Sequence, residues 1–202
     1  METGRMKRLI VLLLGLAVIA GGTVWLLSRR FNPPVETVVS SSLAALQEQN
    51  RLSAFAARFV TVVTSKKTQL GFSAEKTLIL PAMIRYEVDM ARLRQQDLSW
   101  DKDTNTLSVR LPPLQIAGPE FDLGQAREYG SGAVLMALTD VEVALDAENR
   151  AKAREDVIRQ AAGDVTMKLA REATVRAVQS SFAMPLAAAG IEAKVNVTFA
   201  GQ

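Results

Sequence analysis

Three carboxylates stand in the parts of the sequence most able to support chemistry. Asp89 follows an alternating apolar run, and Glu120 and Asp122 follow the Gly118-Pro119 dipeptide. Paired across a cleft, such groups serve as a general acid and base, or they bind a hard cation such as Ca²⁺. The sequence has no Asp-x-Asp-x-Asp-Gly loop, which favours a structural interpretation. In that interpretation Asp89 caps a turn, and Glu120 and Asp122 occupy the exposed side of a strand end.

Two arginines lie on the polar faces of predicted strands that we expect to be neighbours. Arg85 and Arg110 could bind an anionic ligand or a lipid headgroup. In the alternative interpretation, each pairs with an acid across the sheet, such as Glu87. We therefore retain both arginines as candidate contacts for a ligand or a partner.

The absence of cysteine and histidine removes whole classes of chemistry. Thiol nucleophiles, disulfides, zinc-finger spacings, Ser-His-Asp triads and histidine-bound haem all require residues that this chain does not contain. No catalytic motif is recognisable. We predict that the protein is not an enzyme and that it needs no cofactor and no metal.

An uncharged apolar segment lies close to the N-terminus. Residues 9–27 read "LIVLLLGLAVIAGGTVWLL", and a helix of this length spans about 28 Å, close to the thickness of a bilayer's hydrocarbon core. Three basic residues precede the segment and two follow it, which favours a cytoplasmic tail over residues 1–8 and an exported domain after the linker 28–34. The alternative is a signal peptide cleaved after Ala20.

The excess of positive charge belongs to this N-terminal region. Five of the 24 basic residues and one of the 21 acidic residues precede residue 31, which leaves 19 basic and 20 acidic residues in the remainder. No basic patch interleaved with aromatic residues is present. We therefore predict that nucleic acid is not a partner.

Periodicity predicts the elements of the domain. A helix begins near Val35, and alternation predicts strands over 53–63 and 78–88. Residues 98–111 have the pattern of a β-hairpin, and residues 114–121 can form a further strand after two prolines.

Other segments connect or follow these strands. Residues 65–73 are interpreted as a turn, and Pro81 indicates a sheet edge or a bulge. A long helix is predicted over about 140–184, with a possible loosening at Gly163, and a last strand is predicted over 191–199. The helix is predicted to turn an apolar stripe to the core, formed by Ile158, Ala161, Val165, Leu169, Ala173 and Ala177.

Strands grouped ahead of a helix predict an α+β fold. We expect an N-terminal transmembrane helix and then a single domain over residues 35–202. Its mainly antiparallel sheet carries a short N-terminal helix and a long C-terminal helix, and a last strand closes it.

Four motifs along the domain resemble a known family. "LQEQNRLSAF", "RYEVDMARL", "LSVRLPPLQIAGPEFDL" and "GIEAKVNVTF" together are similar to the bacterial domain-of-unknown-function family 4230. The resemblance covers Val35 to Phe199. It implies a membrane span, a helix, a strand-rich middle, a long helix and a last strand, and it implies no established activity.

Three functional hypotheses remain open. The first is a single-pass, membrane-anchored module of the bacterial envelope that binds or scaffolds another protein. It would be held at the inner membrane with its domain in the periplasm or outside, and it would meet its partner through an edge strand or the polar first half of the long helix. A homo-oligomer is compatible with this hypothesis. The alternatives are a lipid- or anion-binding module and a hydrolase that uses Asp89 with Glu120 or Asp122.

Overall fold

The computed structural model describes residues 15–25 and 33–201. Residues 15–25 form a helix with exposed side chains. The predicted tail 1–8, the ends of the predicted anchor 9–27 and most of the linker 28–34 lie outside the described residues. Within the described ranges, no helix is both long enough and apolar enough to cross a bilayer.

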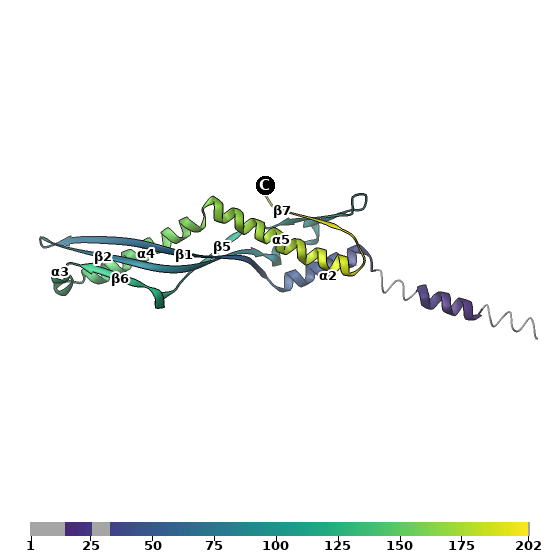
Figure 1. The fold of residues 1–202 in the computed structure, drawn as a ribbon, viewed down its shortest axis with the longest axis horizontal. Helices are drawn as coiled ribbons and strands as arrows, with labels where there is room; N and C mark the ends of the chain where they lie inside the picture. The colour runs from purple at the N-terminus through teal and green to yellow at the C-terminus, as the bar shows by residue number, and fades with distance from the viewer. Residues whose placement is uncertain (1–14, 26–32, 202) are drawn as a thin grey trace, which may run out of the picture.

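A long hairpin forms the body of an elongated molecule (Figure 1). Helix α2 (Val35–Glu48) begins where the sequence predicts a helix, and it leads directly into strand β1 (Arg51–Gln69). Strand β2 (Phe72–Asp89) returns antiparallel beside β1 from Gln69↔Phe72 to Arg51↔Asp89. The predicted turn over 65–73 is therefore wrong for most of its length, because both strands continue to a tight turn at residues 70 and 71.

Strand β2 is the centre of the larger sheet. On the side away from β1 it pairs antiparallel first with β6 (Arg127–Ser131) and then with β5 (Gln115–Phe121). Pro81 lies in the gap between these two partners. A proline without an N–H is tolerated there, so the expected sheet edge at Pro81 is wrong and the interruption is a change of partner.

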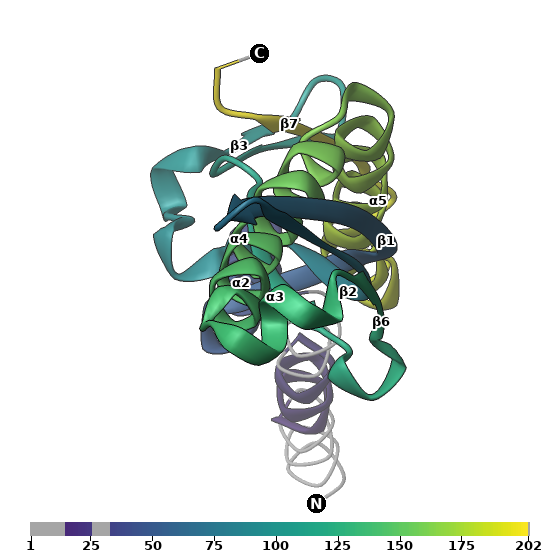
Figure 2. The ribbon, with the colours of Figure 1, turned by 90° about the vertical axis from the view of Figure 1, so that its left-hand side faces the viewer.

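A second sheet lies nearer to α2. The predicted hairpin is present as β3 (Leu98–Asp101) and β4 (Thr106–Leu111), which pair antiparallel. The last strand, β7 (Lys194–Phe199), pairs parallel with β4. Seen end-on, β3 and β7 lie above β1 (Figure 2). The predicted α+β class holds, but the expected sheet is divided into two, and the smaller one is mixed.

The long helix predicted over about 140–184 is two helices. Helix α4 (Val141–Ala161) and helix α5 (Asp164–Ala188) are separated at residues 162 and 163, where Gly163 has the extended backbone of an N-cap. Helix α5 also continues beyond Pro185. Short helices complete the chain: η1 (Met90–Arg92), η2 (Gln95–Asp97), η3 (Leu123–Gln125) and α3 (Ala133–Leu138).

The predicted apolar stripe on these helices is wrong at three of its six positions, whereas Ala161 is buried as predicted. Ile158, Val165 and Leu169 are exposed, and the buried positions combine alanine and polar residues with valine, leucine and phenylalanine. The first half of α4, which the sequence predicts to be polar and able to meet a partner, packs along the sheet through Val141, Leu145 and Asn149. The buried residues of the two helices are Val141, Leu145, Asn149, Ala153, Val157, Ala161, Ala170, Thr174, Val178, Phe182 and Leu186.

The described hydrophobic core is a row of clusters along β2. The alternating residues of the predicted strand 78–88 that face inward are all buried, namely Leu78, Leu80, Ala82, Ile84, Tyr86 and Val88. The Tyr86 hydroxyl donates a 2.8 Å hydrogen bond to the carbonyl of Ala161, which satisfies the C-terminal end of α4 inside the core. In order from the hairpin turn, β2 contributes Ala74, then Leu78 and Leu80, then Ala82, Ile84 and Tyr86, and finally Val88.

Candidate functional site

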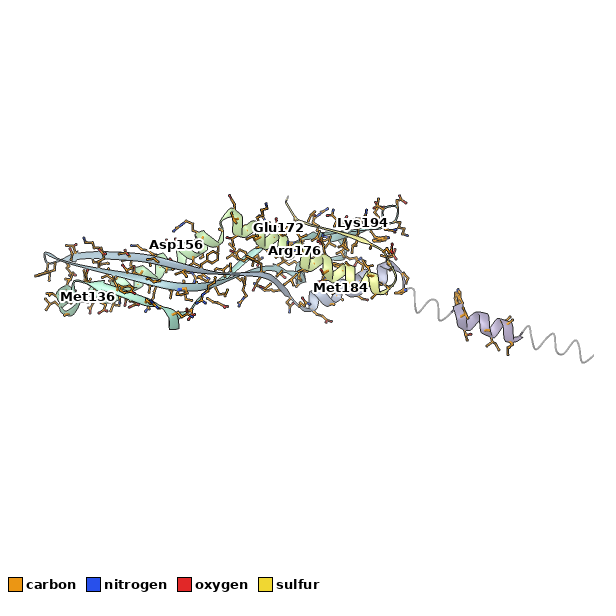
Figure 3. All side chains as sticks on the ribbon, viewed as in Figure 1. Met136, Asp156, Glu172, Arg176, Met184 and Lys194 are labelled. Carbon is orange, nitrogen blue, oxygen red and sulfur yellow. The ribbon has the colours of Figure 1, made fainter. Side chains whose placement is uncertain are left out.

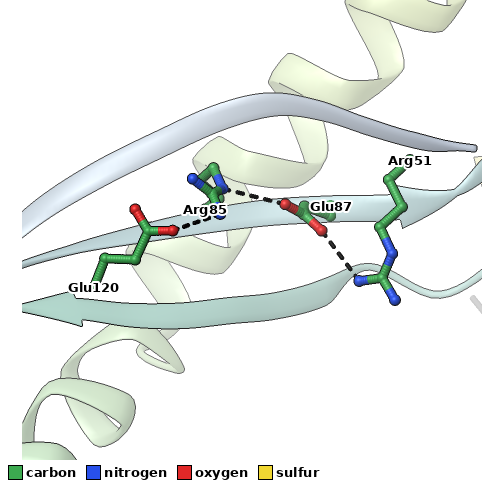
Figure 4. A network of polar contacts seen from close by, with 4 residues as sticks. All are labelled: Arg51, Arg85, Glu87 and Glu120. Atoms are coloured by element: carbon green, nitrogen blue, oxygen red, sulfur yellow. Dashed lines mark hydrogen bonds and ion pairs between the residues drawn. The ribbon is translucent and has the colours of Figure 1, made fainter. Parts of the chain in front are cut away.

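Arg85 belongs to a chain of alternating charges on the outer face of the sheet (Figure 4). Its Nη2 lies 2.6 Å from Oε1 of Glu120, and its Nε lies 3.3 Å from Oε1 of Glu87. Arg51 Nη1 contacts the other oxygen of Glu87 at 3.2 Å. The negative charge of Glu120 and the hydrogen bond to Glu87 raise the pKa of Arg85 above its usual value.

Arg85 therefore has the cross-strand acidic partner that the sequence analysis gives as the alternative to ligand binding. Strand β2 supplies Arg85 and Glu87, β1 supplies Arg51, and β5 supplies Glu120. Such solvent-accessible ion pairs stabilise a fold little and are common on sheet surfaces. The network joins the three strands. Within it, the candidate residues Arg85 and Glu120 form an ion pair with each other.

Asp122 takes part in a second contact across the same face. Its backbone N–H donates to the carbonyl of Pro81, and its side chain lies 3.3 Å from Nη2 of Arg58. The same Arg58 nitrogen donates to Gln125 at 2.9 Å. Asp122 thus ties the start of η3 to β1.

The structure does not bring Asp89 together with the other candidate carboxylates. Asp89 lies opposite Arg51 at the end of β2, whereas Glu120 lies opposite Met83. These positions are six residues apart along one strand, which is about 20 Å. Asp89 occupies the N-cap position of η1, but its side chain makes no capping hydrogen bond. Neither an acid–base pair of Asp89 with Glu120 nor the predicted side-chain cap is formed.

Arg110 lies in the second sheet, so it is not the neighbour of Arg85 that the sequence predicts. It lines a small cavity of about 170 Å³ together with Arg92, Pro112 and Pro113. Among the described residues, neither arginine forms an ion pair or a side-chain hydrogen bond. The two prolines form the elbow at which the chain passes from β4 in one sheet to β5 in the other.

The largest unpaired feature is the edge of β1, which the sequence analysis does not identify. Within the described ranges, β1 pairs only with β2, so one side of a 19-residue strand has no neighbouring strand. An exposed strand edge presents a row of backbone donors and acceptors that can pair with another chain. Strand order decides whether an edge is open, and periodicity alone does not reveal strand order.

The geometry around Pro81 identifies which backbone groups of β1 face outward. The carbonyl of Pro81 accepts from Asp122, so the backbone of Pro81 faces β5 and its partner Val60 faces away from β2. By alternation, Arg58, Val62 and Thr64 also face the open side. The 3.2 Å hydrogen bond from Lys152 Nζ to the carbonyl of Thr64 agrees with this assignment.

Lys152 also limits the open edge. By occupying the Thr64 carbonyl, it covers the edge at that point, while a β-bulge between Ser53 and Phe55 distorts the strand at its other end. The open stretch between these limits contains Val60 and Val62, whose side chains are 54% and 62% exposed. The segment 59–64 reads "FVTVVT", is uncharged and is rich in β-branched residues.

A buried lysine is the second feature that the sequence analysis missed. The side chain of Lys76 is 9% exposed, and its Nζ lies 2.6 Å from Asp146, 2.9 Å from Glu128 and 3.4 Å from Glu142. Burial lowers the pKa of Lys76, but hydrogen bonds and charge from Asp146 and Glu128 outweigh it and raise the pKa above its usual value. Lys76 thereby joins β2, β6 and α4.

The position of Lys76 in the alternation of β2 could have shown from the sequence that its side chain is buried. It falls two residues before Leu78, on the face whose other members are buried. A lysine at an inward-facing strand position requires acidic partners. The acids of "DVEVALDAEN" in the first half of α4 include two of them, so part of that helix's polarity is explained by contacts within the protein.

Comparison with known protein families gave a match that covers most of the domain. The model of a family described as "Protein of unknown function (DUF4230)" matches residues 44–197, which is well over half of the chain. Comparison with curated proteins and comparison with solved structures gave no match.

Proposed function

This chain belongs to the DUF4230 family of proteins of unknown function, and we propose that it is a membrane-tethered module that binds another protein by strand addition to β1. The open, uncharged edge around Val60 and Val62 is the observation that carries the proposal. In strand addition, main-chain hydrogen bonds provide affinity and side-chain contacts provide specificity. The exposed valines would supply apolar contacts beside the new ladder.

The tether is the second part of the proposal. Residues 9–27 would form a single span of the bacterial inner membrane, with residues 1–8 in the cytoplasm and the domain in the periplasm or outside. Helix α2 follows the linker, and the hairpin turn lies at the opposite end of the molecule (Figure 1). A strand of 19 residues extends about 60 Å, so the tether would present the edge at a distance from the bilayer.

The partner is a protein, and a second copy of this chain is one form that it can take. Antiparallel pairing of two β1 edges would place the uncharged segment 59–64 against itself. Arg58 at one end of the segment and Lys66 at the other carry the same charge, which disfavours close pairing of the flanks. A different protein with acidic flanks fits this edge better.

An anion-binding module is the alternative function, and the cavity at Arg110 favours it. Arg92 and Arg110, which form no ion pair among the described residues, line a space of about 170 Å³ together with Asp97, whose side chain accepts a hydrogen bond from the backbone N–H of Arg94. Arginine binds carboxylate and phosphate groups through paired N–H donors. A cavity of this volume suits one such group.

Photocrosslinking in intact membranes tests the main proposal. A benzophenone amino acid placed at Val62 should form adducts with a partner, and one at the exposed residue Arg150 on α4 should not. Adducts of twice the chain's mass would identify a second copy. Equal labelling from both positions, or labelling from Arg150 alone, would contradict an interface at the β1 edge.

A further inference from the structure

The second sheet contains another open edge, at β7. Within the described part of the chain, β7 pairs only with β4, and helix α5 runs along its other side. At one point the helix closes this edge, because Gln179 Nε2 donates a 3.1 Å hydrogen bond to the carbonyl of Val195. The edge beyond Val195 has no comparable cover.

Alternation shows which groups of β7 face the helix. The N–H groups of Lys194 and Ala200 donate to Asn105 and Leu111 on the β4 side. The backbone groups of odd-numbered residues therefore point away from β4. The hydrogen bond from Gln179 of α5 to the carbonyl of Val195 lies on this side of β7. The backbone N–H and carbonyl groups of Val197 and Phe199 point into the space between β7 and α5.

That space is a groove with a volume of about 320 Å³. Its floor and walls combine Val197 and Phe199 of β7 with Val175 of α5, which gives an apolar lining next to unpaired backbone groups. Two outward-facing residues can pair with an added strand of about four residues. The groove thus has the components of a strand-addition site, an open ladder beside an apolar helix face.

Positive charge lies along the helical side of the groove. Lys168 and Arg171 line it, and neither forms an ion pair or side-chain hydrogen bond within the described residues. Glu172 also lines the groove, but it lies 4.0 Å from Arg176 on the same helix. Figure 3 labels Glu172 and Arg176 on α5 and Lys194 on β7. The unpaired charges of the groove are therefore both positive.

We propose that this groove binds an extended peptide segment that carries a carboxylate. The segment adds to β7 through the backbone of Val197 and Phe199, and its carboxylate binds Lys168 and Arg171. Charge-assisted hydrogen bonds between these groups fix the position of the peptide along the groove. This site is separate from the β1 edge and does not depend on the function proposed for that edge.

The carboxylate in this proposal is an acidic side chain of the peptide, and the probes test a free C-terminus as the other source. The reference probe is the fluorescein-labelled peptide Thr-Val-Thr-Val-Glu with a free C-terminus. A second probe is amidated at its C-terminus, a third replaces Glu by Gln, and a fourth carries both changes. Fluorescence anisotropy measures binding to the full chain in lipid nanodiscs. Hydrogen exchange followed by mass spectrometry measures protection of residues 195–200.

The reference peptide should bind and slow amide exchange over residues 195–200, and the doubly changed peptide should bind roughly tenfold more weakly or not at all. The variant K168E/R171E should lose a similar factor for the reference peptide. The single-charge control R150E, on an exposed face of α4, should bind as the unaltered protein does. A variant with an unchanged thermal midpoint shows that the loss is not unfolding.

Several results would overturn the proposal. One is the absence of binding and of protection at about 1 mM reference peptide, a concentration at which even a weak complex is half formed. Another is binding that K168E/R171E leaves unchanged, or protection that appears only in β1. If K168E/R171E alters the thermal midpoint, the peptides alone still test the proposal. Equal binding of the reference peptide and of the peptide that is amidated and carries Gln in place of Glu would exclude a carboxylate site.

Discussion

Val60 lies directly opposite Pro81 in the β1–β2 ladder, and this pair shows the orientation of the β1 backbone from Phe55 to the hairpin turn. Because the Pro81 carbonyl is bonded to Asp122 on the far side, Val60 and every second residue of β1 between the β-bulge at Ser53/Phe55 and the hairpin turn expose their backbone groups at the sheet edge. A single proline thus shows both where β2 changes partner and which residues of β1 remain available.

Two proline substitutions should separate the two sides of β1. In Val62→Pro the lost N–H faces the open edge, so we expect a change in unfolding free energy below about 1 kcal/mol. In Val63→Pro the lost N–H faces β2, and we expect a loss of about 2 kcal/mol or more. Urea unfolding measures both. Equal losses would show that the assignment of the outward residues is wrong.

Removing the buried charge of Lys76 should destabilise the distal half of the hairpin. We expect Lys76→Met to cost about 2–3 kcal/mol at pH 8, because three acids lose their common partner while two of them remain about half exposed. Urea unfolding of both proteins at pH 8 measures this difference.

The same pair of proteins gives a pH dependence with a defined sign. The pKa of Lys76 is higher in the folded chain than its usual value of 10.5, so the folded state retains the proton more strongly. The contribution of Lys76 is complete below pH 10.5 and declines as the pH rises toward the folded pKa. We expect a smaller difference between the two proteins at pH 11 than at pH 8. An equal or larger difference at pH 11 would contradict the charge contacts.

The buried hydroxyl of Thr61 should stabilise the ionised form of Asp156. Its Oγ1 donates a 2.7 Å hydrogen bond to Asp156, and this bond is the main cause of the lowered pKa of that carboxyl. We expect Thr61→Val to cost about 1 kcal/mol at pH 7. Because a lowered carboxyl pKa stabilises above its unfolded value, the cost should shrink as the pH falls below about 3.8.

A matched control exists on the opposite face of the same strand. Thr64 is exposed and shares its hydroxyl contact with Thr77, not with a carboxylate. Thermal unfolding of Thr64→Val should therefore show no difference from the unaltered protein that depends on pH in this range. A parallel pH dependence in both variants would assign the effect to something other than Asp156.

The sequence predicts a strand well where one face of the strand is buried and the other is exposed to solvent. The alternation over 78–88 is such a case, because the helices cover the inward residues of β2 along their length. The lysines and the glycine of residues 65–73 predict a turn, but these residues mostly continue the two strands. Lys66, Lys67 and Gln69 are all exposed, so this part of the hairpin has no alternation of buried and exposed residues that a sequence pattern could reveal.

The buried face of the helices was predicted less well for a different reason. The sequence analysis followed the largest apolar side chains, Ile158, Val165 and Leu169, and these are exposed. Five of the eleven buried positions of α4 and α5 are Ala153, Ala161, Ala170, Asn149 and Thr174, and a search for large apolar side chains does not detect these positions. A break at Gly163 also shifts the phase between the two halves.

Of the candidate site residues, Arg85 and Glu120 were each placed on the exposed side of a strand, and their pairing follows from the register of β2 with β5. Register and strand order depend on contacts between distant segments, and the same is true of both open edges. The separation of Arg85 from Arg110 into different sheets depends on the elbow at Pro112 and Pro113. The two prolines predict a bend in the chain, but they do not predict which sheet the chain enters after the bend.

The arrangement of core clusters along one strand has a consequence for local opening. The cluster nearest the hairpin turn is small, formed by Ala74, Leu135, Val141 and Leu145 with Met136 against it, whereas the cluster nearest α2 is the most extensive described. Regions with fewer buried contacts open at lower free energy. Amide hydrogens should therefore exchange fastest near the hairpin turn and progressively more slowly toward α2, so that the far end of the molecule can loosen while its base stays folded.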